Sequence, residues 1–517
     1  MRVYEGTILT CDKEDHIYRY LVTDCGRILH VGDALPEKYE KAPRTLLGRR
    51  ALIPAFADTH IHFASYATFH AGLNVMEARS NAEILEMLRH YAAKCTDKLL
   101  VGFGASPYSV ADGKLVSREE LDAVCADRPI FLVKYDGHAC VVNTKLLDKL
   151  RKKLEGLRGY HPDTGEMNQE AFFVVSDYVT NSVPLVQLVK NMQSAVDDMA
   201  AKGIGMIHSV SGVGFTGDLD VDLERWFAAG LTNGVQMRVY FQTMSVKKVL
   251  KRKLKCIGGC FETALDGCFG SEDAAMLEPY VHNGEKGVLY YSDEKVTEFC
   301  KEANRMGLQI ELHAIGDDAF RQATQALAAA LEDHPRADHR HTIIHACLPT
   351  EEGIALCAKH GIALAVQSAF IDWPQEPEEY LTKILGAERT AKLNPLRTFV
   401  DRGIVIAAGS DGPCTDPDPM DWIHKACNHA DPAQSLTVPE ALKMCTYNGY
   451  WLSFDEKERG SLEAGKIADM AILSENPCEV EKTQLKNVKV EQLILQGRSY
   501  EKVKKQAVGQ ILRGMKK

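Results

Sequence analysis

The chain has 517 residues, of which 45% are hydrophobic and 26% charged, the composition of a soluble globular protein with a sizeable core. The net charge of −10 leaves no broad basic surface to neutralise phosphates, which argues against a nucleic-acid partner. No apolar run is long enough to span a membrane and the N-terminus lacks a signal-peptide core, so we expect no membrane partner and a cytoplasmic location.

The 15 cysteines are scattered along the chain without a C-x-x-C pair. Such spacing fits neither a zinc knuckle nor the disulfide framework of a small secreted protein. We therefore expect reduced, mostly buried thiols with no role in metal binding.

The two ends of the chain are rich in β-type runs. "RVYEGTILT" (2–10) and "RYLVTDCGRILHVG" (19–32) stand near the N-terminus, and "ADMAILSENP" (468–477) and "VEQLILQGRSY" (490–500) near the C-terminus. Neither end holds enough strands to be stable alone. We predict that residues 1–52 and 455–517 together form one small composite β-sandwich domain.

Between the two ends, short apolar runs recur, and many of them finish on a polar residue. Helical patterns alternate with these runs, as parallel strands require. The pattern predicts a (β/α)8 barrel over residues 53–454, with a doubly wound sheet as the competing α/β fold. The eight runs are "IPAFAD" (53–58), "GMIHS" (205–209), "MRVYF" (237–241), "CFETAL" (260–265), "IELHA" (310–314), "TIIHA" (342–346), "IALAVQS" (362–368) and "IVIAAGS" (404–410).

Three of the intervening segments predict helices most clearly. Residues 183–203 carry apolar side chains at three-to-four spacing and end on Gly203. Residues 292–307 begin with capping residues and end on glycine, and residues 317–333 are rich in strong helix formers.

A long insertion interrupts the barrel after its first strand. Residues 64–200 are far more than one helix needs, and they contain strand-like runs of their own, "LLVGFGA" (99–105) and "PIFLVKYDGHA" (129–139). Because the insertion follows the strand that ends in "HIH", we expect it to cover the mouth of the barrel.

Two H-x-H pairs occur in the chain, although 18 histidines in 517 residues give only about 0.6 such pairs by chance. His60 and His62 follow the first predicted strand. His339 and His341 lie in the charged stretch "EDHPRADHRH", where solvated loop histidines are the better interpretation.

Metal-ligand types fall at or near the carboxyl ends of several predicted strands, which converge on one mouth in a barrel. Any one of them could be structural, and His208 is assigned a structural role by default. Imidazoles and carboxylates on five separate strands are harder to dismiss. Besides His60 and His62, these candidate metal ligands are Glu262, His313, His345 and Asp411.

"PAFADTHIHF" (54–63) resembles the P-G-F-x-D-x-H-x-H segment of the amidohydrolase superfamily, whose metal ligands occupy strands one, four, five, six and eight. Further segments are similar to its YtcJ-like and formamide-deformylase-like branch, in the family's order and over nearly the whole chain. They are "YDGHACVVN" (135–143), "LHAIGDDAF" (312–320), "HTIIHA" (341–346), "AAGSDGPCTDPDPMDWI" (407–423) and "GSLEAGKIADMAIL" (460–473).

The chain departs from the family at two positions. Ala55 stands where the family has glycine, which matters only if that backbone needs positive φ. Where many relatives have a lysine four residues before "DG", often interpreted as a carbamylated bridging ligand, this chain has Glu262 in "ETALDG". A glutamate can bridge two metals directly, and a site with one metal is equally possible.

The ligand types suit one or two zinc ions, with iron or manganese as alternatives. Zinc acidifies its water and polarises a carbonyl, and Asp411 is the predicted catalytic acid and base. His138 matches a position that the family places near substrate. Tyr108 and Trp373 are candidates for lining the pocket, and Asp317 is a candidate partner that orients His313, or else a helix cap.

The leading hypothesis is a hydrolase that cleaves an amide or other non-peptide carbon–nitrogen bond in a small molecule, of the N-acyl or N-formyl amine class. The alternatives are a deaminase of a small heterocycle and a non-catalytic binding protein on the same barrel. A structural metal site is less consistent with an open, carboxylate-bearing ligand set. A homodimer is the default expectation for the assembly.

Overall fold

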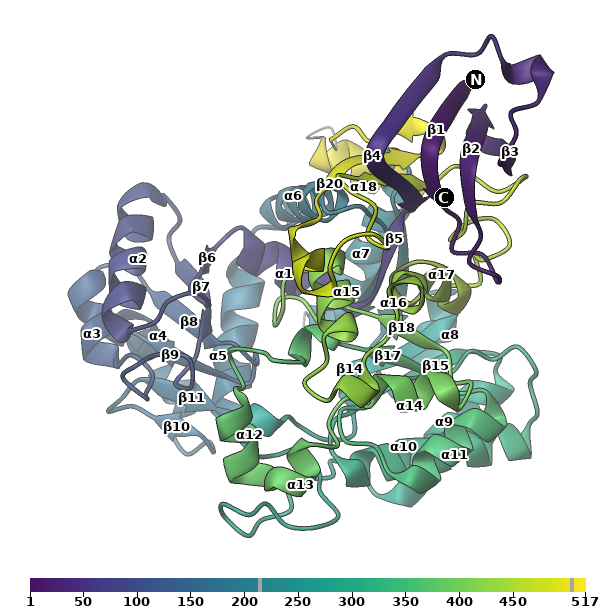
Figure 1. Cartoon of the computed structure of the whole chain (residues 1–517). Coiled ribbons are helices and arrows are strands. Elements are labelled where there is room, and N and C mark those ends of the chain that lie inside the picture. The colour runs from purple at the N-terminus through teal and green to yellow at the C-terminus, as the bar shows by residue number, and fades with distance from the viewer. Residues whose placement is uncertain (213–215, 503–505) are drawn as a thin grey trace.

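Eight parallel strands form a nearly closed barrel at the centre of the molecule (Figure 1). The computed structural model describes residues 1–212, 216–502 and 506–517. Every apolar run predicted as a barrel strand contributes to one of the eight, so the barrel is confirmed over the doubly wound sheet. In spatial order the strands are β18 (Ile406–Ala408), β17 (Ala363–Val366), β16 (Thr342–His345), β15 (Gln309–Ala314), β14 (Cys256–Ala264), β13 (Gln236–Phe241), β12 (Ile204–Ser211) and β5 (Phe56–Ile61).

Helices surround the barrel, and the three predicted most clearly are α6 (Leu185–Ala201), α9 (Asp293–Arg305) and α10 (Asp317–Asp333). Helix α9 begins where Ser292 accepts a hydrogen bond from the Lys295 amide, the expected N-cap interaction. The others around the barrel are α1 (Phe63–His70), α7 (Leu219–Gly230), α8 (Val246–Lys251), α11 (Glu351–His360), α14 (Leu396–Asp401), α15 (Pro419–Cys427), α16 (Val438–Cys445) and α17 (Tyr447–Leu452).

The barrel closes between its first strand, β5, and the segment that follows its last strand, β18. The Asp411 amide donates to the His60 carbonyl over 2.8 Å, and the His62 amide donates to the Gly412 carbonyl over 3.0 Å. The buried carboxylate of Asp58 accepts hydrogen bonds from the amide and hydroxyl of Ser410, over 2.9 and 2.7 Å. Closure therefore places the H-x-H segment directly beside Asp411.

The insertion after β5 forms a lobe of its own beside the barrel, at the left of Figure 1. Its strands are ordered β10-β11-β9-β8-β7-β6 and are packed with helices α2 to α5. The strands are β6 (Leu73–Asn74), β7 (Leu100–Ala105), β8 (Ile130–Lys134), β9 (Ala139–Val142), β10 (Tyr160–His161) and β11 (Glu166–Asn168), and the helices are α2 (Asn81–Lys94), α3 (Arg118–Val124), α4 (Thr144–Leu154) and α5 (Gln169–Ser182).

Strands from both chain ends share one seven-stranded sheet, at the upper right of Figure 1. Near the C-terminus, α18 (Ala507–Met515) packs against the barrel helix α7, where Gly514 lies close to the Trp226 carbonyl. The assignment of residues 1–52 and 455–517 to a separate domain stays a prediction. In spatial order the strands are β21 (Arg498–Ser499), β20 (Val490–Leu495), β19 (Met470–Leu473), β4 (Arg44–Pro54), β1 (Arg2–Leu9), β2 (Ile17–Asp24) and β3 (Arg27–Gly32).

No single helix in the described ranges is long and apolar enough to cross a membrane. Helices α5 and α6 meet the criteria of length and composition only as a pair, and they are bent by 95° at the break between them. The apolar face of α6 packs inside the protein, since Leu188, Met192 and Val196 are buried in the core around the barrel.

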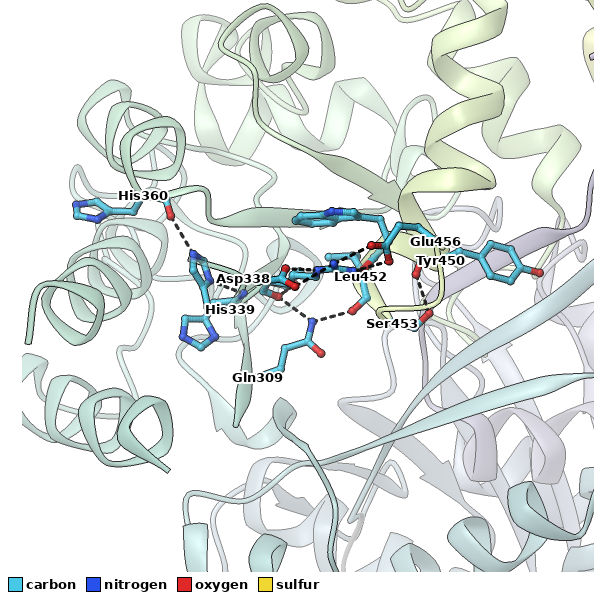
Figure 2. Close-up of polar contacts among 12 residues, drawn as sticks. Gln309, Asp338, His339, His360, Tyr450, Leu452, Ser453 and Glu456 are labelled. Carbon is cyan, nitrogen blue, oxygen red and sulfur yellow. Dashed lines mark hydrogen bonds and ion pairs between the residues drawn. The ribbon is translucent and has the colours of Figure 1, made fainter. Parts of the chain in front are cut away.

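The prediction that His339 and His341 are solvated loop histidines is wrong. Their side chains are 4% and 0% exposed at the amino end of the barrel, opposite the H-x-H of β5. Figure 2 shows the polar network that buries this segment: His339 Nε2 faces the His360 carbonyl, and Gln309 donates to the Leu452 carbonyl. The charged sequence concealed this burial because the partners come from residues far away in the chain.

Helix α7 buries a carboxyl group against β12. Glu224 is 0% exposed, and Ser209 on β12 donates a hydrogen bond to it. Burial raises the pKa of Glu224 to about 8, with the nearby Asp220 adding to the shift and the hydrogen bond from Ser209 opposing it. The folded protein therefore holds a proton on Glu224 at pH values where the unfolded chain, with an ordinary glutamate pKa of 4.5, has lost it.

This proton makes stability depend on pH. The contribution of Glu224 is fully present below the unfolded pKa and is lost as the pH rises through the folded pKa, at up to about 1.4 kcal/mol per pH unit. We predict that the Glu224→Gln variant lacks this loss, so that its stability relative to wild type increases between about pH 5 and about pH 8. Urea unfolding of both proteins across this range measures the difference, and a constant difference would contradict the prediction.

Candidate metal centre and cavity

Six potential ligand side chains converge at the carboxyl end of the barrel. They form three overlapping groups, and within each group the ligand atoms all lie within 4.8 Å of one another. Four histidines and Asp411 had been predicted from the sequence, and Cys260 had not. The groups are His60, His62 and Cys260; Cys260, His313 and His345; and His60, His345 and Asp411.

Asp411 lies at the centre of this arrangement. Its Oδ1 atom is 3.2 Å from His60 Nε2 and 3.3 Å from His62 Nε2, yet neither ring nitrogen is aligned to donate a hydrogen bond to it. Burial alone would raise the pKa of Asp411, but the facing imidazoles hold it well below its usual range. The carboxylate is therefore charged at neutral pH and available to a cation.

The backbone at two of these residues adopts the left-handed conformation. Asp411 has φ of 54° and His345 has φ of 70°, values that L-residues rarely adopt. Such strain persists only where the surrounding structure holds it, and it clusters at functional sites. Here the hydrogen bond from the Asp411 amide to the His60 carbonyl helps to hold it.

Burial disfavours the charged form of two of these histidines, and two have a polar neighbour at the second ring nitrogen. Burial lowers the pKa of His60 and takes that of His345 well below its usual value, so both present ring lone pairs. Gln367 Oε1 lies 2.6 Å from His345 Nδ1, and Asp266 Oδ1 lies 3.2 Å from His313 Nδ1. Metal-bound histidines usually have such partners on the second ring nitrogen.

The donor set fits a divalent cation. Several imidazole nitrogens, one thiol and one carboxylate converge, and Asp411 Oδ1, which has no hydrogen-bond partner in the described residues, is a polar atom that a cation would satisfy. Imidazole and thiolate donors favour zinc among the common divalent metals.

Glu262 is placed apart from these groups. Its carboxylate is exposed and accepts a hydrogen bond from Thr243 Oγ1 over 2.7 Å, and it belongs to no ligand group in the part of the chain that the structure describes. Asp317 also lies elsewhere, because its Oδ1 atom accepts a hydrogen bond from the Leu277 amide. The carboxylate beside His313 is that of Asp266.

Comparison with known proteins agrees with this geometry. The model of the amidohydrolase family matches residues 47–500. The chain belongs to the amidohydrolase family. It is 26% identical to the putative amidohydrolase YtcJ of Bacillus subtilis, over 91% of this chain and 93% of that one. It is 23% identical to the N-substituted formamide deformylase of Arthrobacter pascens, over 95% and 96% of the two chains.

A solved structure shows the same fold. An uncharacterised metal-dependent hydrolase of Pyrococcus furiosus matches this amidohydrolase with a TM-score of 0.73, at 23% identity, over 92% of this chain and all of that one. The two chains thus share the fold over most of this chain and all of the other.

The candidate metal centre of this amidohydrolase opens into a cavity of about 1250 Å³, larger than most small-molecule sites. The barrel forms one side and the insertion forms the other. Aromatic side chains from both parts line it, including Phe103, Phe131, Phe172, Phe261 and Phe370. The predicted substrate-binding residues His138, Tyr108 and Trp373 also line this cavity.

Hydrogen bonds to the Gly270 carbonyl join the insertion to the barrel at the cavity wall, next to a buried ion pair within the insertion. Lys134 Nζ on β8 lies 2.8 Å from Asp136 Oδ2 and donates to the Gly270 carbonyl, which follows β14, over 3.0 Å. Although burial opposes the charged form of Lys134, Asp136 raises the pKa of Lys134 above its usual value. The Tyr108 hydroxyl donates to the same Gly270 carbonyl over 2.9 Å.

Sequence reasoning missed Cys260, Asp266 and Gln367. Cys260 is the first residue of the predicted strand 260–265 rather than a residue at its carboxyl end, and the expectation that the thiols have no role in metal binding also set it aside. Asp266 and Gln367 each follow closely on a barrel strand, the position where orienting partners are found. Nothing local showed which imidazole each of them would face.

The Lys134→Met variant leaves the buried Asp136 carboxylate without its cation. We predict a loss of about 3–5 kcal/mol in the free energy of unfolding, the cost of an uncompensated buried charge. Urea unfolding measures the loss, and the double variant Lys134→Met/Asp136→Leu should recover most of it. Lys149→Met, at an exposed position of α4, is the control, expected within about 0.5 kcal/mol of wild type. A Lys134→Met variant with the same free energy of unfolding as this control would show that the ion pair does not stabilise the fold.

Proposed function

We propose that this protein is a metal-dependent hydrolase that cleaves an amide or other non-peptide carbon–nitrogen bond of a small molecule. The observation that carries the proposal is the Asp411 carboxylate, which lies 3.2 and 3.3 Å from two histidine nitrogens and lines a large cavity. The likeness to an N-substituted formamide deformylase supports N-formyl or N-acyl amines as the substrate class.

His60, His62, His313, His345 and Asp411 would hold the metal, for which zinc is the best match to the donor atoms. When bound there, a divalent cation would polarise the substrate carbonyl and lower the pKa of a water molecule. The charged Asp411 accepts a proton from the attacking water and returns it to the leaving nitrogen. Water adds to the carbonyl carbon, the carbon–nitrogen bond breaks, and the products are a carboxylate and an amine.

The cavity indicates what the substrate looks like. Phe370 stacks on the ring of His345 with centroids 5.9 Å apart, and Trp373 stacks on Phe370 at 4.8 Å, so aromatic surface extends from the ligands into the cavity. We propose that His138, Tyr108 and Trp373 contact a substrate that carries an apolar or aromatic group. Burial of such a group against an apolar wall of this size would contribute favourably to the free energy of binding.

The test is turnover of a panel of N-formyl and N-acyl derivatives of aromatic amines, with amine and carboxylate measured together. We expect equimolar products, loss of activity on chelation and recovery with zinc. Release of ammonia from heterocyclic amines without a carboxylate would indicate a deaminase instead. No turnover of either panel by a folded, metal-loaded protein would favour a binding protein.

The Asp411→Asn variant tests the proton transfer. We predict a fall in kcat on the order of 10³-fold, because the amide cannot accept the proton. Metal content is measured on the same sample, since Asp411 is also a candidate ligand. The control is Asp401→Asn at an exposed position of α14, expected to keep wild-type kcat. Near wild-type turnover by Asp411→Asn would exclude this role.

A further inference from the structure

Three side chains each belong to two of the ligand groups in the metal centre, namely His60, His345 and Cys260, and Cys260 is the only one of them that is not a histidine. Cys260 Sγ lies within 4.8 Å of the ligand atoms of His60 and His62 in one group, and of His313 and His345 in another. Its distance to His60 Nε2 is 3.6 Å. The thiol therefore stands between the two histidines that end β5 and the two that come from β15 and β16.

A bulge in β14 produces this placement. Gly259 pairs with Leu312 of β15, yet the next pair joins Ala264 to His313, so residues 260–263 have no partner on that strand. The Cys260 amide instead donates to Gln242 Oε1 over 2.8 Å. Bulges re-aim side chains near active sites, and here the bulge and Gln242 fix Cys260 at the centre of the barrel mouth.

The same bulge takes Glu262 out of the ligand groups. In a regular strand residues 260 and 262 would point to the same face. In the bulge, Phe261 has φ of 49°, and the Glu262 carboxylate accepts its hydrogen bond from Thr243 at an exposed position. The two neighbours Gln242 and Thr243 thus hold the thiol at the histidines and the carboxylate away from them.

We propose that Cys260, rather than Glu262, is the ligand shared by two metal ions in this centre. One cation is bound by His60 and His62 with Asp411 beside them, the other by His313 and His345, and the Cys260 thiolate serves both. This inference rests on the metal centre of the proposed function, but it does not require that any particular substrate be turned over.

A shared thiolate has chemical consequences that a shared carboxylate lacks. The Cys260 thiol releases its proton to solvent when the sulfur–metal bonds form, so metal uptake releases protons. Soft sulfur favours zinc or cobalt, whereas hard carboxylate oxygen favours manganese or magnesium. We therefore expect the protein to take up zinc and cobalt in preference to manganese.

Cobalt is the probe for the test. The metal-free protein is titrated with cobalt(II), bound metal is counted by elemental analysis, and the sulfur-to-cobalt charge-transfer absorption is recorded in the near ultraviolet. We expect about two equivalents and the absorption band in wild type. In Cys260→Ala we expect loss of the band and about one equivalent or less, and Glu262→Gln should keep both. Cys260→Ser, which keeps the side-chain volume, should also lose the band.

Cys347→Ala is the matched control, because Cys347 is another buried thiol of the same cavity that belongs to no ligand group in the described ranges. It should keep the band and the stoichiometry. A band that persists in Cys260→Ala, or a wild-type protein that binds cobalt without a band, would overturn the proposal. So would loss of one equivalent in Glu262→Gln alone. Hydrolysis does not enter these readouts, so an inactive protein with a cobalt–sulfur band would refute the proposed function and leave this inference intact.

Discussion

The closure of the barrel between β5 and the segment after β18 is the constraint on which the site depends. The backbone hydrogen bonds that join the two segments are made by His60, His62, Asp411 and Gly412, three of which are candidate ligands. The barrel therefore cannot close without bringing two imidazoles to the Asp411 carboxylate. The buried Asp58, bonded to Ser410 and to the His60 amide, secures the same junction on the side of the core.

Chemistry and substrate contact are divided between two parts of the molecule. The candidate ligands come from the barrel strands or from the segments that directly follow them. The cavity wall opposite comes from the insertion, whose aromatic side chains can vary without disturbing the barrel. Hydrogen bonds from Lys134 and Tyr108 to the Gly270 carbonyl join the two parts.

The electrostatics of the centre follow from burial and mutual contact. Burial lowers the pKa values of His60 and His345, while the imidazoles that face Asp411 lower the pKa of its carboxyl group against the effect of burial. A carboxylate among imidazole side chains offers the donor atoms of a cation site, and a thiolate among them would favour softer metal ions such as zinc.

The sequence by itself determined the eight barrel strands, the principal helices and the convergence of His60, His62, His313, His345 and Asp411. Apolar runs and strand-end positions are local patterns, and the geometry of a parallel barrel turns them into one site. Only the tertiary structure decided which of Cys260 and Glu262 lies among the histidines. Two residues apart, both would point to the same face of a regular strand, but a bulge in β14 directs them apart, with Cys260 bonded to Gln242 and Glu262 to Thr243. The tertiary structure also decided the burial of His339 and the pairing of Asp266 with His313. These depend on contacts between distant segments, which no local pattern records.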